Sequence, residues 1–289
     1  MSIKSSELIL NTDGSVYHLN LKPVHIAKDI IFVGDQDRVT KITKHFDSIE
    51  FTTQKREFKT TTGLYKNKRL SVISTGIGPD NIDIVLNELD ALVNIDLETK
   101  KPKKKLTSLN IIRIGTSGAL QNDIPIDSFL MSSYGLDLNG MLHSYHVENI
   151  GNPNIENAFV KHTNWSTKKA TPLLISCSKT LADTFVSSNM YTGITATAGG
   201  FYGPQGRILR LALQDNNLNS KIDTFNFEHH RITNLEMETA AIYGLSKLLG
   251  HKACSLNAII ANRANGTFSK NPNKVIESLI AYTLEKLTI

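Results

Sequence analysis

Residues 111–120 have the sequence Ile-Ile-Arg-Ile-Gly-Thr-Ser-Gly-Ala-Leu, in which a buried strand runs into a turn that suits an anion. The β-branched run Ile111–Ile114 is typical of a strand that is covered on both faces. Arg113 lies inside this run, and burying a guanidinium is costly unless a carboxylate or a bound anion neutralises it. The turn adds two glycines and two hydroxyls, which together with backbone N–H groups suit a phosphate.

On either side of this strand, short apolar runs alternate with amphipathic segments. The other runs that we predict to be strands are Ile30–Val33, Leu70–Thr75, Phe129–Met131, Ile194–Thr197 and Ala258–Ala261. Apolar residues three and four positions apart predict helices over residues 82–92, 237–248 and 274–287. This alternation predicts an α/β fold with helices on both faces of a largely parallel or mixed sheet. No linker divides the chain, so we predict a single domain over residues 1–289.

The composition is typical of a globular protein from a reducing compartment. Hydrophobic residues make up 40% of the chain, which is enough for a full core. Cys177 and Cys254 are too few for a disulfide framework, and both lie in apolar stretches. No apolar run has the length of a signal peptide or of a membrane span. We therefore expect a soluble cytoplasmic protein without a membrane partner.

One run of lysines accounts for the net charge of +5. Residues 100–105 have the sequence KKPKKK, so the rest of the chain is balanced. Such a run can bind nucleic acid, but no aromatic residue interleaves this one and Pro102 keeps it out of a helix. We interpret it as part of a solvated surface loop over residues 95–108, and we expect no nucleic-acid partner.

The segment that follows the first predicted strand is a second candidate for an anion site. Ligands of such sheets bind at the carboxyl ends of the strands. Gly34 stands at that position and lets the backbone approach a ligand closely, while Arg38 lies one turn into an amphipathic helix. The pattern GxxxxGK[ST] is absent, so the sequence does not predict binding of a nucleoside triphosphate.

Eight motifs in a fixed order resemble the nucleoside phosphorylase family, which includes uridine phosphorylase and the trimeric or hexameric purine phosphorylases. They are VYHLNL (16–21), VGDQDRV (33–39), KREF (55–58), STGIG (74–78), IRIGTSGAL (112–120), FYGPQGR (201–207), NLEMETAA (234–241) and IIANR (259–263). The resemblance implies a three-layer α/β/α sandwich with a central twisted mixed sheet. It also implies a homo-oligomer built from dimers, with active sites shared across the dimer interface. Relative to the family, the lysine-bearing loop is an insertion.

The resemblance assigns residues to the phosphate and to the ribose. The phosphate site would comprise Gly34, Arg38, Arg113 and Thr116, with Arg56 reaching in from the neighbouring subunit. Forked guanidinium groups suit an oxyanion. The ribose site would comprise Met237 and Glu238, with His18 of the partner chain. Without the resemblance, Glu236 and Glu238 would be interpreted as an exposed first helical turn, and His18 as an ordinary surface histidine.

The base site implied by the resemblance favours uracil. Phe201 would stack on the base, and Gln205 and Arg207 would recognise the uracil edge, because an amide both donates and accepts. Arg263 belongs to the loop Ala261-Asn262-Arg263, where relatives that act on purines usually carry an aspartate. We therefore predict phosphorolysis of uridine to uracil and ribose 1-phosphate. The catalytic residues would be Arg113, Gln205, Arg207 and Glu238. The alternative for residues 205–207 is a plain polar turn.

The prediction includes inorganic phosphate as co-substrate and no other cofactor. Some relatives bind a potassium ion at the dimer interface. Glu57 and Ile77 match that site, but Asn81 stands where a serine is usual, so the match is incomplete. No cluster of metal ligands and no pairing of a nucleophile with a base is apparent in the sequence.

Three alternatives remain open at this stage. A purine nucleoside phosphorylase with a modified base pocket is the nearest, and a hydrolytic nucleosidase on the same fold is the second. The third is a non-catalytic protein that binds nucleosides or nucleic acid through the lysine-bearing loop. Several candidate phosphate arginines argue against the hydrolase, because a water nucleophile does not need them.

Overall fold

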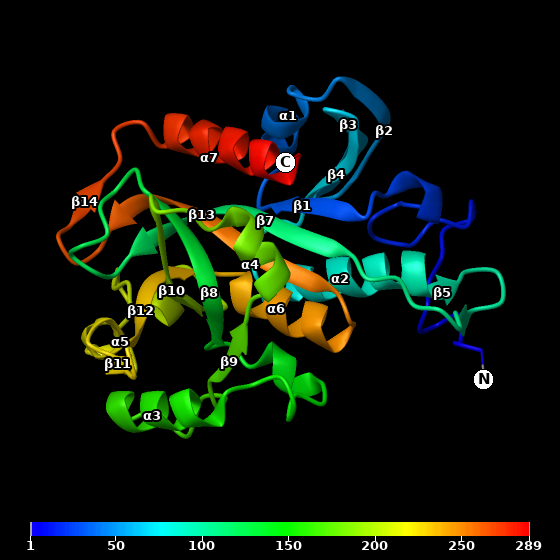
Figure 1. Ribbon diagram of the computed structural model, residues 1–289. Coiled ribbons are helices and arrows are strands. Elements are labelled where there is room, and N and C mark those ends of the chain that lie inside the picture. Colours follow the sequence, from blue (N-terminus) through cyan, green and yellow to red (C-terminus); the bar gives the residue numbers. More distant parts are fainter. Residues whose placement is uncertain (1, 289) are drawn as a thin grey trace.

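A computed structural model describes residues 2–288 of the chain, which are built around one large mixed sheet (Figure 1). Within these residues the strands of the sheet follow the order β11-β12-β10-β8-β13-β7-β1-β4-β3-β2, with β14 paired to β13 and β9 to β8. The bounds of the strands are β1 (Asp29–Val33), β2 (Ser48–Lys55), β3 (Phe58–Tyr65), β4 (Lys68–Ser74), β7 (Asn110–Ala119), β8 (Phe129–Asp137), β9 (Leu173–Ser176), β10 (Met190–Thr197), β11 (Asn226–Phe227), β12 (His230–Glu236), β13 (Lys252–Asn262) and β14 (Thr267–Phe268).

Two parallel groups of strands make up the centre of this sheet. Strands β4, β1, β7 and β13 form one group, and β8, β10 and β12 form the other. The groups meet where β13 runs antiparallel to β8. All six predicted strands are present and most are longer than predicted, because each apolar run continues into polar residues that still pair. The predicted turn after Ile114 is wrong, since residues 115–118 still belong to β7 and pair with β13.

The second group curls round until β12 reaches β7. Asn234 and Leu235 pair with Ala119 and Gly118, so β7, β13, β8, β10 and β12 form a closed ring of strands. This closure brings the end of the Arg113 strand beside the end of β12, which leads into the Glu-Met-Glu segment. Such long-range pairing has no local signal in the sequence.

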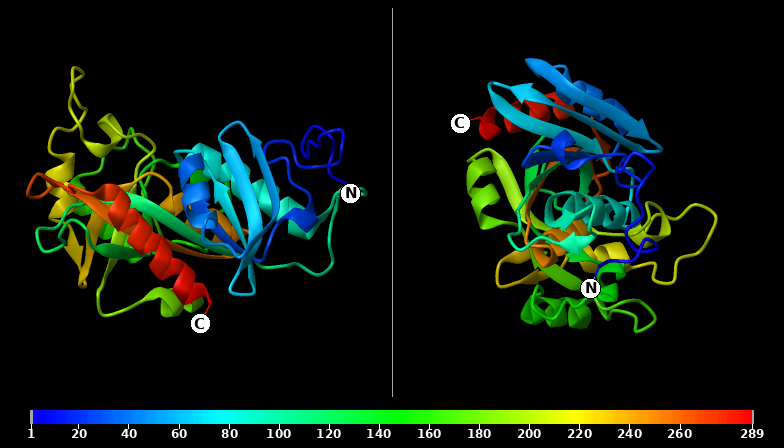
Figure 2. Two further views of the ribbon diagram at one scale, coloured as in Figure 1. Left: turned by 90° about the horizontal axis from the view of Figure 1, so that it is seen from above. Right: turned by 90° about the vertical axis from the view of Figure 1, so that its right-hand side faces the viewer.

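Helices cover both faces of the sheet, as Figures 1 and 2 show, so the three-layer prediction is confirmed. Along β1, Ile30 and Phe32 pack with α2 and α6, whereas Ile31 and Val33 pack with α1 and α7 on the opposite face. This alternation is the two-residue period of a strand that is buried on both sides. The helices are α1 (Gln36–Thr43), α2 (Pro79–Asn94), α3 (Pro153–Thr163), α4 (Lys179–Phe185), α5 (Leu218–Asp223), α6 (Thr239–Leu248) and α7 (Pro272–Leu287).

The three predicted helices are present, with one correction. The predicted stripe on the second of them included Met237, but α6 begins at Thr239, and Met237 lies in the connection from β12. The side chain of Glu236 accepts hydrogen bonds from the backbone N–H groups of Glu238 and Thr239. The helix therefore starts two residues later than its apolar spacing suggests.

Two regions differ from the simple alternation of the sequence. The hairpin of β2 and β3 extends the sheet, although β2 is largely exposed and rich in polar residues. Residues 95–102 form a small hairpin of β5 (Ile95–Asp96) and β6 (Lys101–Pro102). Lys101 and Lys103–Lys105 are exposed on and after it. Among residues 2–288, no helix combines the length and the apolar character needed to cross a membrane.

Candidate active site

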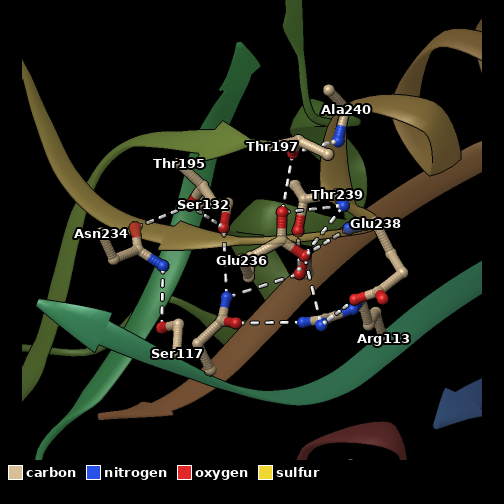
Figure 3. A network of polar contacts seen from close by, with 12 residues as sticks. Arg113, Ser117, Ser132, Thr195, Thr197, Asn234, Glu236, Glu238, Thr239 and Ala240 are labelled. Carbon is tan, nitrogen blue, oxygen red and sulfur yellow. Dashed lines mark hydrogen bonds and ion pairs between the residues drawn. The ribbon is translucent and has the colours of Figure 1, made fainter. Parts of the chain in front are cut away.

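Arg113 lies at the centre of the candidate site and is almost completely buried. Its guanidinium Nη2 lies 2.6 Å from Oε2 of Glu238 and 3.2 Å from Oε2 of Glu236 (Figure 3). Its Nη1 donates to Oδ1 of Asn257 at 3.0 Å. Burial alone would lower the pKa of Arg113, but the two carboxylates outweigh burial and raise it. The buried guanidinium is therefore charged and held by protein carboxylates, which is one of the two solutions that the sequence left open.

The two glutamates of the Glu-Met-Glu segment have different partners. Glu236, at the end of β12, accepts from the backbone N–H groups of Glu238 and Thr239 and from Oγ1 of Thr197 at 2.7 Å. Glu238 directs Oε1 to the backbone N–H of Gly78 at 2.8 Å. Their exposed fractions are only 4% and 6%, so the alternative of an exposed helical turn is wrong. Glu236 is a structural anchor, and Glu238 faces both Arg113 and the loop before α2.

A chain of polar side chains runs through the interior of the strand ring, and one residue from each strand contributes to it (Figure 3). Asn257 of β13 donates to Ser132 of β8 at 3.2 Å, and the Ser132 and Thr195 hydroxyls are 2.5 Å apart. Thr195 of β10 donates to Asn234 of β12 at 2.8 Å, which donates to Ser117 of β7 at 2.9 Å. Buried polar groups must be paired, and this chain pairs them while holding Asn257 against Arg113.

The sequence analysis did not predict this chain of polar side chains. A faint signal was available, because Ser132, Thr195 and Asn257 are polar residues inside otherwise apolar strands. Such residues point to a polar interior only once the strands are known to close into a ring.

Arg38 lies close to Arg113, as the phosphate prediction requires. Its Nη1 donates to the backbone carbonyl of Ile114 at 3.3 Å, and its Nη2 lies 3.0 Å from Oδ2 of Asp35. Burial lowers the pKa of Arg38, and the charges of Arg113 and Glu238 are close enough to act on it. The structure therefore places both guanidinium groups in one partly buried region, where Arg38 faces Asp35 and Arg113 faces the two glutamates.

The other predicted phosphate residues surround this pair of arginines. Gly34 links β1 to α1, and its α-carbon faces the backbone of Gly76 at the end of β4. Thr116 follows Arg113 on β7 and is half-buried. Arg56 is exposed in the turn between β2 and β3, and its backbone carbonyl accepts from Nε2 of Gln36 at 2.6 Å. The structure thus brings the turn that carries Arg56 against the first phosphate loop of its own chain.

His18 lies against α2, and its ring is 6.5 Å from that of Phe58 at the start of β3. Its Nδ1 is 2.6 Å from Oε1 of Glu88, and the Glu88 carboxylate also accepts from the backbone N–H groups of His18 and Leu19. The side chain keeps 28% of its surface exposed. Within one chain His18 is therefore a partly exposed histidine that Glu88 orients, and its role in a neighbouring subunit stays a prediction.

The three residues of the predicted cation site lie together around Gly76. A β-carbon at this glycine would be 2.4 Å from Nδ2 of Asn81 and 3.0 Å from Cγ of Glu57, so both side chains touch it. Asn81 also donates to the carbonyl of Ile77 at 3.4 Å. The grouping agrees in position with the prediction, while the role in cation binding stays a prediction.

Phe201, Gln205 and Arg207 form one compact unit in the loop after β10. The guanidinium of Arg207 lies 3.8 Å from the centre of the Phe201 ring, and Nη1 donates to Oε1 of Gln205 and to the Phe201 carbonyl, each at 2.5 Å. Gln205 is only 3% exposed, whereas Phe201 is 50% exposed. The Arg207 guanidinium thus lies over the Phe201 ring and holds the buried amide of Gln205, while the assignment of these residues to a base stays a prediction.

Arg263 extends this unit from the end of β13. Its alkyl chain packs over Gly118, 3.6 Å from where a β-carbon would stand, and its Nη1 is buried without a hydrogen-bond partner within residues 2–288. Burial lowers the pKa of Arg263, and the positive charge of Arg207 lowers it further. No carboxylate of the described residues forms an ion pair with either arginine. This end of the site therefore has a surplus of positive charge.

The fold and the comparisons with known proteins together define an enzyme that transfers a pentosyl group. The chain belongs to the Phosphorylase superfamily, whose family model matches residues 28–284. This membership agrees with the resemblance seen in the sequence motifs, and it makes a nucleoside and phosphate the substrates of the class.

Individual relatives match along almost the whole chain. A uridine phosphorylase from Thermococcus kodakarensis is 29% identical over 276 residues, covering 93% of this chain and 86% of the relative. The crystal structure of a Trypanosoma brucei nucleoside phosphorylase, described as showing uridine phosphorylase activity, is 27% identical with a TM-score of 0.87, covering 97% and 99% of the two chains. A purine nucleoside phosphorylase of the DeoD type from Colwellia psychrerythraea is 26% identical over 276 residues, covering 93% and 98%.

Proposed function

We propose that this protein is a uridine phosphorylase, which converts uridine and inorganic phosphate into uracil and ribose 1-phosphate. The observation that carries the proposal is the base end of the site. There a buried amide, Gln205, stands beside two guanidinium groups, Arg207 and Arg263, that have no carboxylate partner in the described residues. Uracil leaves with negative charge on its ring, and unpaired positive charge stabilises such a leaving group.

The phosphate nucleophile belongs at the opposite end, beside Arg38 and Arg113. A phosphate oxygen attacks C1′ of the ribose while the bond from C1′ to N1 of uracil breaks, and the electron pair of that bond leaves with the base. Thr116 and the backbone at Gly34 complete the phosphate site. Holding both reactants in line replaces an improbable encounter with an ordered one, which is a large part of the rate enhancement.

Glu238 connects the two ends through the sugar. Its carboxylate is held by Arg113 and by the N–H of Gly78, so its position is set before a nucleoside enters. With Met237 packed against the sugar, Glu238 accepts hydrogen bonds from the ribose hydroxyls. A phosphate that binds Arg113 competes for the same guanidinium, which leaves the carboxylate more available to the ribose. This mechanism uses no metal ion and no covalent enzyme intermediate.

The purine alternative is disfavoured by the loop that follows β13. Residues 261–268 contain no carboxylate that could protonate a purine ring. Asn262 cannot serve in its place, because its amide donates to the carbonyls of Gln121 and Ile124 and its oxygen accepts from the N–H of Ala264. Asn262 is therefore fully occupied in shaping the loop that presents Arg263.

A substrate panel tests the proposal directly. The protein is incubated with uridine, thymidine, inosine and adenosine, each with and without phosphate, and release of the free base is followed. We expect cleavage of uridine that requires phosphate. Release without phosphate would indicate a hydrolase, and cleavage of inosine without cleavage of uridine would replace the pyrimidine assignment.

We further propose that the enzyme acts in the cytoplasm as a homo-oligomer. The two cysteines, Cys177 and Cys254, are free thiols, which agrees with a reducing compartment. Arg56 and His18 lie on exposed parts of one chain, and the oligomer would bring them into the phosphate and ribose sites of a neighbour. A monovalent cation at Glu57, Ile77 and Asn81 belongs to the same proposal. Size-exclusion chromatography with light scattering tests the homo-oligomer, and its repetition with and without potassium tests whether the cation supports the oligomer.

A further inference from the structure

A cleft with a volume of about 910 Å³ lies beside the proposed base end of the site. Its walls come from the segment after β8, from residues 165–170 after α3, and from the loop over residues 198–215. Its lining includes Arg207 but not Arg113, Phe201, Gln205 or Glu238. The volume falls within the range of small-molecule sites. The cleft is thus a separate space that shares one residue with the base site.

The lining of this cleft has a marked surplus of positive charge. Lys168, Lys169, Arg207 and Arg210 line it, and none of the four forms an ion pair within residues 2–288. The acidic residue in the lining is Asp215, which is already paired with Lys221 at 2.7 Å. Clefts lined by one sign of charge concentrate ligands of the other sign. The cleft therefore favours an anion.

The cleft also presents apolar and aromatic surface. Trp165 and Tyr202 line it, and the Lys169 ammonium lies 4.7 Å from the centre of the Trp165 ring. Leu209 and Leu211 line it as well, each with 76% of its surface exposed. A free phosphate would make no contact with this apolar surface, and an apolar solute would not neutralise the four cationic side chains. Exposed apolar side chains around a concave space mark a binding site for a ligand with a matching face.

We propose that this cleft binds a nucleotide, with the phosphate on Lys168 and Arg210 and the aromatic base against Tyr202, Trp165 and the leucines. Base stacking on aromatic side chains and forked contacts from arginine to phosphate are both well suited to such a ligand. Binding at this cleft is an additional property of the chain and does not depend on which nucleoside the enzyme cleaves.

A nucleotide in this cleft would act on the base site through Arg207. Its Nη1 holds Oε1 of Gln205, the amide that would recognise uracil. A phosphate on Lys168 and Arg210 brings negative charge into the cleft that Arg207 also lines, and its attraction for this guanidinium weakens the contact with Gln205. The nucleotide is therefore expected to inhibit turnover. This effect on turnover rests on the proposed function, whereas binding itself does not.

The chain contains one tryptophan, Trp165, which lines this cleft, so its fluorescence reports on binding there. Uridine monophosphate and adenosine monophosphate are titrated in turn while Trp165 emission is recorded, with uridine and inorganic phosphate as controls for the two halves of the ligand. We expect a saturable change with at least one nucleotide, weakened by added salt because the contacts are ionic. Little change is expected with uridine or phosphate.

Two matched variants sharpen the titration. Lys168→Ala combined with Arg210→Ala removes two charges from the cleft and leaves Trp165 and Lys169 in place. The half-saturating nucleotide concentration should rise by about tenfold or more, equivalent to roughly 1.4 kcal/mol. Lys104→Ala combined with Lys105→Ala removes the same net charge from the exposed lysine run and should leave the titration unchanged.

Several results would overturn the proposal. These are no response to either nucleotide at millimolar concentration, an equal response to uridine or phosphate alone, and an unaltered titration of the cleft variant. Inhibition of uridine cleavage is measured separately with the same two variants. A protein that failed to cleave uridine yet showed the fluorescence response would refute the proposed function and leave the nucleotide site standing.

Discussion

The two ends of the active site are built in opposite ways. At the phosphate end, Arg113 is buried in a strand and held by Glu236, Glu238 and Asn257, and the polar chain inside the strand ring supports it. At the base end, Arg207 and Arg263 belong to segments that follow strands, and neither has a carboxylate partner among the described residues. One end is rigid and neutralised, and the other is looser and positively charged.

This difference teaches how one scaffold can keep its chemistry while its substrate varies. Positioning the phosphate and the sugar requires a fixed geometry, so the residues come from strands whose rotamers are locked by packing. Recognition of the base needs only a few contacts from a loop, and loops tolerate change. The match of this chain to both uridine and purine phosphorylases fits such a division.

Loss of Arg113 should have the largest effect, because it breaks the rigid end. Arg113→Ala removes the phosphate contact and leaves Glu236 and Glu238 buried without a cation. We expect kcat/KM for phosphate to fall by about 10³-fold and the free energy of unfolding to fall by roughly 3–5 kcal/mol. Steady-state kinetics and thermal unfolding measure the two effects. Arg113→Lys keeps the charge and should recover much of the stability, but little of the rate.

Loss of Arg207 should have a smaller effect that is confined to the open end. Arg207→Ala should lower kcat/KM for uridine by about 10²-fold and leave the KM for phosphate nearly unchanged. Stability should change little, because this guanidinium is partly exposed. Arg231→Ala, which removes a partly exposed arginine paired with Asp123, is the matched control. If the Arg113 and Arg207 variants weakened phosphate binding equally, the two ends would be wrongly assigned.

The acid side of the pH profile should report Glu238. Burial raises the pKa of this carboxyl, with Arg113 opposing the shift. As the pH falls, Glu238 gains a proton at a higher pH than an exposed glutamate does. We then expect kcat/KM for uridine to drop by up to tenfold per pH unit. Because the folded state binds this proton more tightly than the unfolded state, the stability contribution is present at low pH and is lost as the pH rises through the folded pKa.

Protonation of Glu238 should therefore inactivate the enzyme without unfolding it. Uridine turnover should fall while circular dichroism still shows the folded state. Glu238→Gln should remove the acid limb and keep only residual activity. An unchanged acid limb in that variant would assign the titration to another group.

Much of the rigid end was predictable from the sequence, because burial leaves a local pattern. Runs such as Ile111–Ile114 contain apolar residues on both faces, and one arginine among them demands a counter-charge. The identity of that counter-charge was not predictable without the resemblance. Glu236 and Glu238 meet Arg113 only because β12 pairs with β7, a contact between residues more than a hundred positions apart. The β2–β3 hairpin was missed as well, because β2 is exposed and has no apolar period.

The polar chain in the strand ring should contribute a smaller effect, transmitted through Arg113. Asn257→Ala leaves Nη1 of Arg113 without a partner and removes one of the two hydrogen-bond partners of the Ser132 hydroxyl. We expect a loss of roughly 1–3 kcal/mol in the free energy of unfolding. We also expect a rise in the KM for phosphate that exceeds the change in the KM for uridine. Thr283→Ala removes a buried hydroxyl on α7, which donates to the carbonyl of Leu279, and is the control. Equal changes in both KM values would assign Asn257 to the core alone and not to the orientation of Arg113.

The lysine run should have the smallest effect, because it lies outside both ends of the site. Replacing Lys100, Lys101, Lys103, Lys104 and Lys105 with alanine should leave uridine turnover unchanged, since four of these side chains are exposed on or after the small β5–β6 hairpin. Stability should shift by no more than about 0.5 kcal/mol, as is usual for surface positions. RNA binding by the unaltered protein, measured at physiological salt, should be absent. If instead the protein bound RNA through these lysines and cleaved no nucleoside, it would be a nucleic-acid binding protein with a phosphorylase fold. The difference between the two ends of the site would then not reflect catalysis.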